Sequence, residues 1–193
     1  MENTNLFLDL TESEMLALCK RVMNLEPAAR DCVVERYDGI DLDALILTHA
    51  RTWYSRLLIE APATLLPTDD IKDLITLVDC GQGVVRAHLP ECCVRPLEVQ
   101  LQHWEHSVTT FASPQDGLAQ LQLNPWTRGG MHHPVAVDHG SHLMLYSLPL
   151  GQTPVLLQAR CVVHRQDRFC FHHSAVSMLA TYLAQAITLT PEL

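Results

Sequence analysis

Lysine is scarce in this chain of 193 residues, which carries 13 Lys and Arg against 22 Asp and Glu; Lys20 and Lys72 are its only lysines. A protein that binds nucleic acid by neutralising phosphates needs a basic face. The best basic cluster, formed by Arg160, Arg165 and Arg168, is typical of a solvated strand end. We therefore expect no direct nucleic-acid binding as the main function.

Long apolar runs are also missing. No stretch approaches the roughly 18 uninterrupted apolar residues that a membrane-spanning helix needs. The first ten residues have no basic start and no long apolar run, so we expect neither a signal peptide nor a membrane anchor. The seven cysteines are odd in number and irregularly spaced. This pattern indicates reduced thiols in a cytoplasmic setting, most of them serving as small apolar core residues.

Recognisable catalytic motifs are absent from the sequence. It contains no nucleophile elbow, no glycine-rich phosphate loop and no dinucleotide fingerprint. Gly81-Gln82-Gly83 precedes a strand-like run, whereas a phosphate loop precedes a helix. Cys92-Cys93 near His88 suggests a thiol–imidazole pair, but the local motifs of known cysteine enzymes do not accompany it. We expect no enzyme, no catalytic residue and no cofactor.

Histidine, by contrast, is abundant, with 11 residues. Adjacent histidines on a strand point to opposite faces and rarely bind one ion. The spacing of His139 and His142 crosses an expected turn and matches no closed zinc pattern. We therefore expect no bound metal, and a metal-dependent enzyme using His132, His139 or His142 is the least favoured alternative.

Helical periodicity dominates residues 9–66. Thr11 and Glu14 form a capping box before an apolar stripe. Pro27 is placed to begin a second helix that runs toward Tyr37, and a third, longer helix runs from near Asp41 to Ala61. Residues 68–70 are placed to cap a short helix over 71–77.

Alternating apolar residues and turn signals follow Gly83. The expected strands are 84–89, 97–104, 107–111, 135–137, 143–148 and 155–165. The turn at 113–116 is placed to cap a short helix through Leu121, His139-Gly140-Ser141 is typical of a hairpin turn, and 174–189 has the pattern of an amphipathic closing helix.

These patterns predict an α+β protein, with an N-terminal helical hairpin or small bundle, a mostly antiparallel sheet region and a C-terminal helix. We divide it into an acidic helical region, 1–79, with 15 acidic and 7 basic residues, and a strand-rich region, 80–193, that includes the closing helix. The two regions could also form one compact unit.

The segment from Asn124 to Gly130 is an expected shaped loop between strands. It combines a rigid proline, a tryptophan, an arginine and two permissive glycines. Tryptophan and arginine are enriched at interface anchors, so we select Trp104, Asn124, Trp126 and Arg128 as candidate partner-interface residues. Two alternatives stay open: Trp126 covers the apolar layer of its own sheet, and Arg128 holds its own loop instead of pairing with acids of a neighbour.

The run from Leu65 to Pro149 resembles neck or connector proteins of tailed bacteriophages, including crAss-like phages. The matching parts are Leu89-Pro90-Glu91, Val99-Gln100-Leu101-Gln102-His103-Trp104, Gln122-Leu123-Asn124, Arg128-Gly129, Pro134-Val135-Ala136-Val137 and Leu143-Met144-Leu145-Tyr146-Ser147-Leu148-Pro149. The order and spacing of these parts carry the resemblance, over somewhat under half of the chain.

The resemblance implies a non-enzymatic virion structural protein, many copies of which form a head–tail connector or neck ring. Its implied partners are copies of itself and portal or tail proteins, with assembly in the host cytoplasm and a final place in the neck or tail region of the virion. The alternative is an intracellular protein–protein adaptor unrelated to phage that acts through its acidic helices. No membrane partner is expected.

Overall fold

The computed structural model describes residues 6–25 and 41–188. The described residues form two compact units. We call them the helical unit, from the described parts of residues 1–67 and 165–193, and the strand unit, residues 68–164. The α+β class predicted from the sequence is confirmed.

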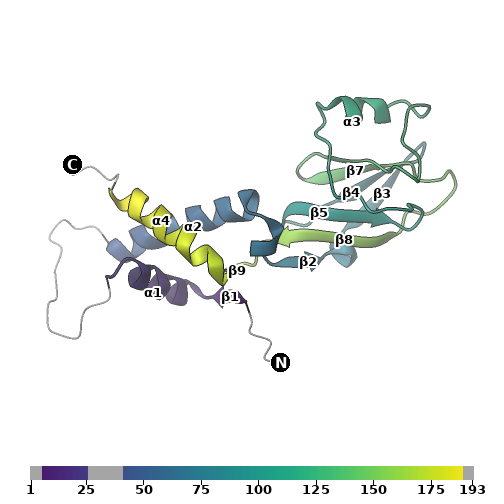
Figure 1. Cartoon of the computed structure of the whole chain (residues 1–193). Helices are drawn as coiled ribbons and strands as arrows, with labels where there is room; N and C mark the ends of the chain where they lie inside the picture. Colours follow the sequence, from purple (N-terminus) through teal and green to yellow (C-terminus); the bar gives the residue numbers. More distant parts are fainter. Residues whose placement is uncertain (1–5, 26–40, 189–193) are drawn as a thin grey trace, which may run out of the picture. The chain divides into compact units, whose positions relative to one another are not determined.

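The helical unit gathers segments from both ends of the chain (Figure 1). Its helices are α1 (Glu12–Val22), α2 (Leu42–Glu60) and α4 (Val176–Thr188), with 3-10 turns η1 (Ala63–Leu65) and η3 (His173–Ala175). As predicted, the capping box of Thr11 and Glu14 begins α1, and Asp41 caps α2 through the backbone N–H groups of the two residues that follow Leu42. The predicted helix from Pro27 toward Tyr37 lies outside the described residues.

An antiparallel pair of strands joins the N-terminal and C-terminal segments of the helical unit. Strand β1 (Phe7–Leu10) pairs with β9 (Phe169–His172). The Trp53 ring meets Phe171 edge-on at 5.2 Å between centroids. The Tyr54 hydroxyl donates to the Cys170 carbonyl at 3.2 Å and accepts from the Cys170 N–H at 3.1 Å. These contacts fix β9 against α2.

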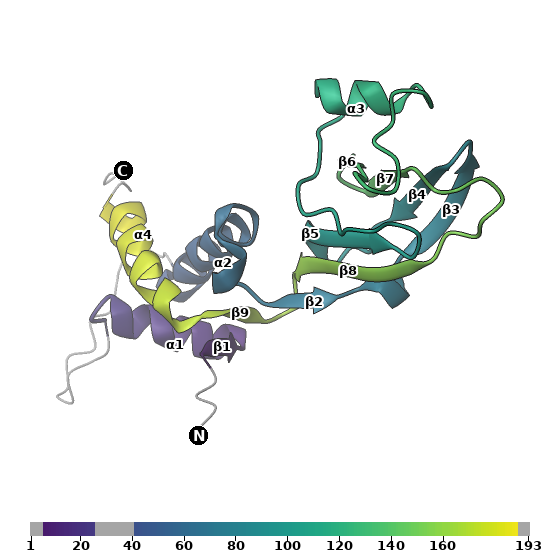
Figure 2. The same cartoon turned by 45° about the vertical axis from the view of Figure 1, so that its right-hand side comes forward.

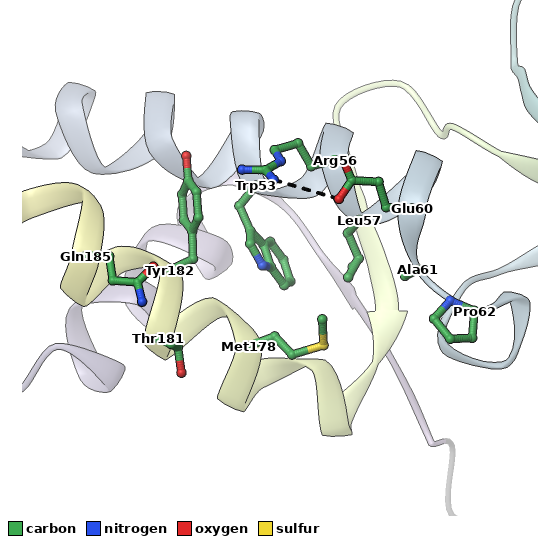
Figure 3. A pocket seen from close by; sticks show the side chains of 10 residues that line it. All are labelled: Trp53, Arg56, Leu57, Glu60, Ala61, Pro62, Met178, Thr181, Tyr182 and Gln185. Carbon is green, nitrogen blue, oxygen red and sulfur yellow. Dashed lines mark ion pairs between the residues drawn. The ribbon is translucent and has the colours of Figure 1, made fainter.

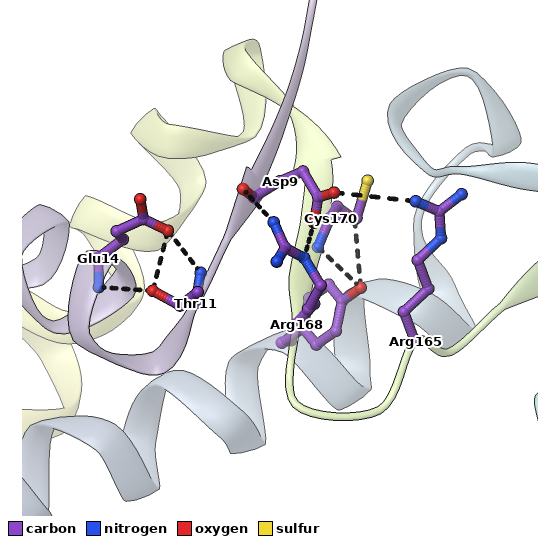
Figure 4. A network of polar contacts seen from close by, with 7 residues as sticks. Asp9, Thr11, Glu14, Arg165, Arg168 and Cys170 are labelled. Carbon is purple, nitrogen blue, oxygen red and sulfur yellow. Dashed lines mark hydrogen bonds and ion pairs between the residues drawn. The ribbon is translucent and has the colours of Figure 1, made fainter.

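Asp9 is the centre of a polar network on the same pair of strands (Figure 4). The Arg168 Nε donates to Asp9 Oδ1 at 2.6 Å, and Arg165 lies 3.9 Å from Asp9 Oδ2. Two residues of the basic cluster seen in the sequence therefore share the Asp9 carboxylate within the helical unit. Nearby, Thr11 donates its backbone N–H to Glu14 at 2.8 Å, and this contact is the largest cause that lowers the pKa of Glu14.

The strand unit contains two antiparallel sheets. One has the order β2-β8-β5, and the other has the order β3-β4-β7-β6. Its elements are β2 (Thr68–Asp70), η2 (Lys72–Leu74), β3 (Thr76–Gly81), β4 (Val84–His88), β5 (Cys93–Leu101), α3 (Gly117–Gln122), β6 (Ala136–Asp138), β7 (His142–Tyr146) and β8 (Leu156–Val163).

The four-stranded sheet buries apolar side chains on both faces. On β7, Leu143 and Leu145 belong to the core shared with β5 and β8, whereas Met144 and Tyr146 pack in a second cluster with residues near α3. This division follows from the two-residue period of a strand. Figure 2 shows α3 over β6 and β7, on the side of this sheet away from β5 and β8. Helix α3 thus covers one of the two buried faces of this sheet.

The division into units differs from the predicted one at 79/80. The strand unit begins at Thr68, because β2 pairs with β8, and α4 belongs to the helical unit, because it packs against α1 and α2. The predicted helix over 71–77 is also wrong: only the turn η2 forms there, and β3 begins at Thr76. The predicted strand at 107–111 reduces to a single bridge between Val99 and Val108.

No helix in residues 6–25 and 41–188 is long and apolar enough to cross a membrane. The cysteines in these residues are free thiols. Cys19, Cys161 and Cys170 are buried, as predicted for core residues, and Cys80 is exposed. Burial raises the pKa of Cys19 to about 11, so this thiol is protonated near neutral pH.

Candidate protein-binding site

The candidate site is the segment that follows α3, which we call the Trp126 loop (residues 123–130). Helix α3 begins after Asp116, whose carboxylate accepts the Ser113 N–H at 2.6 Å. Ala119 and Gln122, three residues apart on one face of the helix, are buried. Leu118 and Leu121, also three apart, are exposed. The short helix therefore presents apolar residues to solvent as well as to the sheet.

Asn124 organises the turn of the Trp126 loop. Its side-chain oxygen accepts the Trp126 N–H at 3.0 Å, and its carbonyl accepts the Thr127 N–H at 3.1 Å. The Thr127 hydroxyl also donates to the carbonyls of Asn124 and Leu121. Asn124 is thus a positioning residue that sets the backbone on both sides of Trp126.

Arg128 ties the loop to the sheet. Its Nε donates to the Gln122 carbonyl at 2.8 Å, its Nη1 donates to the Gln82 carbonyl in the β3–β4 turn, and its guanidinium lies 5.5 Å from the centre of the Tyr146 ring. Burial raises the pKa of Tyr146, and the positive charge of Arg128 opposes that shift. The sequence left open whether Arg128 pairs with acids of a neighbour or holds its own loop. In the structure, Arg128 holds its own loop.

Two glycines permit the close backbone approaches around Arg128. A Cβ on Gly129 would lie 2.2 Å from the His133 carbonyl oxygen. Gly83 has φ +75°, and a Cβ there would lie 2.5 Å from the Leu148 carbonyl oxygen. Either side chain would force backbone to move, since atoms at these distances overlap. The loop is therefore fixed by packing as well as by hydrogen bonds.

Trp126 is 94% exposed, more than any other large apolar side chain in the described residues. The sequence had left open that Trp126 covers the apolar layer of its own sheet. Its exposure shows that it does not. Other large apolar side chains close to Trp126 in the sequence are also exposed: Leu118, Leu121, Leu123 and Met131. An indole held in water by a fixed loop is the kind of group that anchors protein interfaces.

Trp104 lies elsewhere. It is 3% exposed in the main core of the strand unit, and its indole N–H donates to the Tyr146 carbonyl at 3.0 Å. Its side chain is occupied within the fold and is not on the surface. The structure therefore brings Asn124, Trp126 and Arg128 together and assigns Trp104 to the core.

The histidines of the metal alternative are placed differently from one another. His139 and His142 stack at 4.8 Å between ring centroids, while His132 Nδ1 lies 2.6 Å from Glu105 Oε2. Burial, followed by the nearby positive groups, lowers the pKa of His142. Across 6–25 and 41–188 no three His, Cys, Asp or Glu side chains are grouped to hold a metal ion.

Sequence reasoning missed the partners of the loop. Gln82, Gly83 and Tyr146 hold Arg128 from the β3–β4 turn and from β7, and they lie far from it in the sequence. Gly81 and Gly83, on either side of Gln82, are a sequence signal for a turn at this place. The sequence analysis compared them only with a phosphate loop. No family model matches the chain, and no curated protein matches it.

Proposed function

We propose that the chain is a non-enzymatic virion structural protein, a subunit of a head–tail connector or neck ring in a tailed bacteriophage. The single observation that supports a binding role most strongly is Trp126, 94% exposed on a loop that Asn124 and Arg128 hold in place. The resemblance of residues 65–149 to phage connector proteins supplies the kind of assembly. The partners proposed are other copies of the chain and portal or tail proteins.

The energetics favour a docking role for Trp126. Burying a tryptophan removes about 150–250 Å² from water, which corresponds to roughly 4–6 kcal/mol of gross stabilisation at ~25 cal/mol per Å². Because the loop is already fixed, binding costs little further conformational entropy. An exposed tryptophan that stays in water gains none of this stabilisation.

Ring formation is tested with the purified full-length protein. Native mass spectrometry and electron microscopy from micromolar to millimolar concentration, with and without a crowding agent, should show closed rings of one copy number. Trp126→Ala should lower the ring fraction, and Leu74→Ala, which removes another exposed leucine of the strand unit, should leave it unchanged. A monomer under all these conditions would overturn the connector proposal, and a pull-down of one defined cellular protein would then favour the adaptor.

A further inference from the structure

The strand unit carries a cavity of about 270 Å³ between α3 and the four-stranded sheet, which we call the α3 cavity. Its apolar lining comes from α3, the residue after it, and the sheet face that α3 covers: Ala119, Leu123, Val137, Met144 and Tyr146. A cavity of about 150 Å³ can hold a benzene ring, whereas drug-sized ligands occupy roughly 300–1,000 Å³. The size of the α3 cavity therefore indicates a small ligand, such as one ring with a short chain.

The same cavity is lined by three groups that are positive or become positive on protonation. Arg86 lies on β4, His142 on β7, and His139 in the turn that joins β6 to β7. The lining residues include no Asp or Glu. Among the residues that the structure describes, no carboxylate forms an ion pair or hydrogen bond with Arg86. The charge of the cavity therefore favours an anionic ligand.

The larger groove of the helical unit, between α2 and α4, lacks this excess of positive charge (Figure 3). Its volume is about 590 Å³, and its two charged lining residues, Arg56 and Glu60, pair with each other at 3.8 Å. A pair of opposite charges favours neither an anionic nor a cationic ligand. The α2–α4 groove therefore does not indicate the chemistry of a ligand, whereas the α3 cavity does.

The surroundings of His142 support an anion site. Burial is the largest cause that lowers the pKa of His142, and three groups that are or can become positive follow it: His139, Arg86 and His88. Asp138 acts in the opposite direction, and its carboxylate also accepts the Gly140 N–H at 2.7 Å. A second carboxylate in the α3 cavity would stabilise the protonated form of His142, because opposite charges attract at short range.

We propose that the α3 cavity binds a small organic carboxylate, with its apolar body between α3 and the sheet and its carboxylate at Arg86, His139 and His142. The guanidinium of Arg86 stays charged at neutral pH, so binding does not depend on the histidines alone. The apolar lining excludes water from the body of the ligand, which adds hydrophobic stabilisation. This binding function is independent of ring assembly.

Isothermal titration calorimetry of the full-length protein tests the ligand class. Phenylpropionate and hexanoate should each bind one to one at about pH 6, where their carboxylates are ionised. Phenylpropionamide lacks the charge and acetate lacks the apolar body, so each should bind at least tenfold more weakly than phenylpropionate. The affinity for phenylpropionate should rise as the pH falls from about 8 to about 6, because the bound anion favours protonated His142.

Variants at exposed positions test the place of binding. Arg86→Gln should weaken phenylpropionate binding at least tenfold, and Arg86→Lys should recover part of the loss. Leu123→Glu puts a negative charge in the lining and should also weaken binding. Leu121→Glu is the matched control, because Leu121 is an exposed residue of α3 outside the lining, and it should bind as the wild type does. Circular dichroism should confirm that every variant is folded.

NMR of the histidine rings provides a readout that does not depend on affinity. Saturation with phenylpropionate should raise the pKa of His142, whose signal is identified with His142→Gln. No saturable binding of either carboxylate would overturn the proposal, and so would acetate or inorganic phosphate binding as tightly as phenylpropionate. Binding that Arg86→Gln and Leu123→Glu leave unchanged, or a pKa of His142 that does not move, would place the ligand outside the α3 cavity and contradict the proposal.

Discussion

Arginine is a common anchor of protein interfaces, but Arg128 stabilises the fold of its own chain. Its guanidinium makes hydrogen bonds to two carbonyls, from α3 and from the β3–β4 turn, and it lies against Tyr146. A planar group with several donors can make all three contacts at once, which a lysine cannot. Arg128 is therefore engaged within its own fold, whereas Trp126, two residues before it, is exposed.

Removal of Arg128 should therefore destabilise the strand unit. Arg128→Ala should lower the free energy of unfolding by about 2 kcal/mol, because two charge-assisted hydrogen bonds and a cation–π contact are lost. Arg128→Lys should recover less than half of this. Urea denaturation measures both. Arg160→Ala, which breaks a surface pair with Glu98 at 3.3 Å, is the matched control and should change stability by less than about 0.5 kcal/mol.

The three tryptophans make the exposure of Trp126 directly measurable. Trp53 and Trp104 are 5% and 3% exposed, so acrylamide should quench mainly the emission of Trp126 in the dilute protein. Trp126→Phe should abolish the quenchable component and shift the remaining emission to shorter wavelength. A variant that keeps an easily quenched fraction would show that a second tryptophan reaches solvent.

At the scale of elements, success and failure of the sequence-based predictions have a common cause. The beginning of α1 was predicted because Thr11 and Glu14 are close in sequence and cap each other. Strands β1 and β9 were missed because each is four residues long and is stabilised by the other, from opposite ends of the chain. Strand β3 was missed because it is largely exposed and shows little apolar alternation.

In the candidate site, too, local features were predicted from the sequence and long-range contacts were not. The turn at Asn124 depends on local hydrogen bonds and was predictable. The contacts of Trp104 and Arg128 were not, because both depend on Tyr146, which gives Trp104 a carbonyl acceptor and Arg128 an aromatic ring. The sequence around Trp104 or Arg128 does not indicate that either residue contacts Tyr146.

The cap of α1 provides a test at this scale. Thr11→Ala should cost about 1 kcal/mol of unfolding free energy, since the Glu14 N–H and the Thr11 side chain lose their bond. Thr52→Ala on α2 removes a hydroxyl that only bonds its own helix and should have little effect. Thermal unfolding followed by circular dichroism measures both changes.

The histidine cluster on β4 and β7 predicts a pH dependence. The pKa of His142 lies below its ordinary value of 6.5, because of burial and the nearby His139, Arg86 and His88. The unfolded chain therefore binds more protons at this site, and stability should fall as the pH drops through 6.5 toward the lowered value. His142→Gln should reduce this loss, as measured by urea midpoints between neutral pH and about pH 5. An unchanged slope would contradict the assignment to His142.

At the scale of the whole molecule, one unit is continuous in sequence and the other is not. The strand unit, residues 68–164, has its own core and all its sheet partners within one segment. The helical unit needs segments from before and after it.

A fragment of residues 68–164 should consequently fold alone. Its far-ultraviolet circular dichroism should be that of an antiparallel sheet protein, and it should unfold cooperatively in urea. A fragment of residues 1–67 lacks β9 and α4 and should remain largely unfolded. Cooperative folding of the shorter fragment, or an unfolded strand unit, would contradict this division.

The pairing of β1 with β9 has a consequence for synthesis on the ribosome. Because chains emerge from the N-terminus, α2 is made long before α4, and the strand unit can be complete while the helical unit still waits for its last segment. The α2–α4 groove then exists only on finished polypeptides. Products that end before β9 would therefore carry a complete strand unit together with a β1 strand that has no partner.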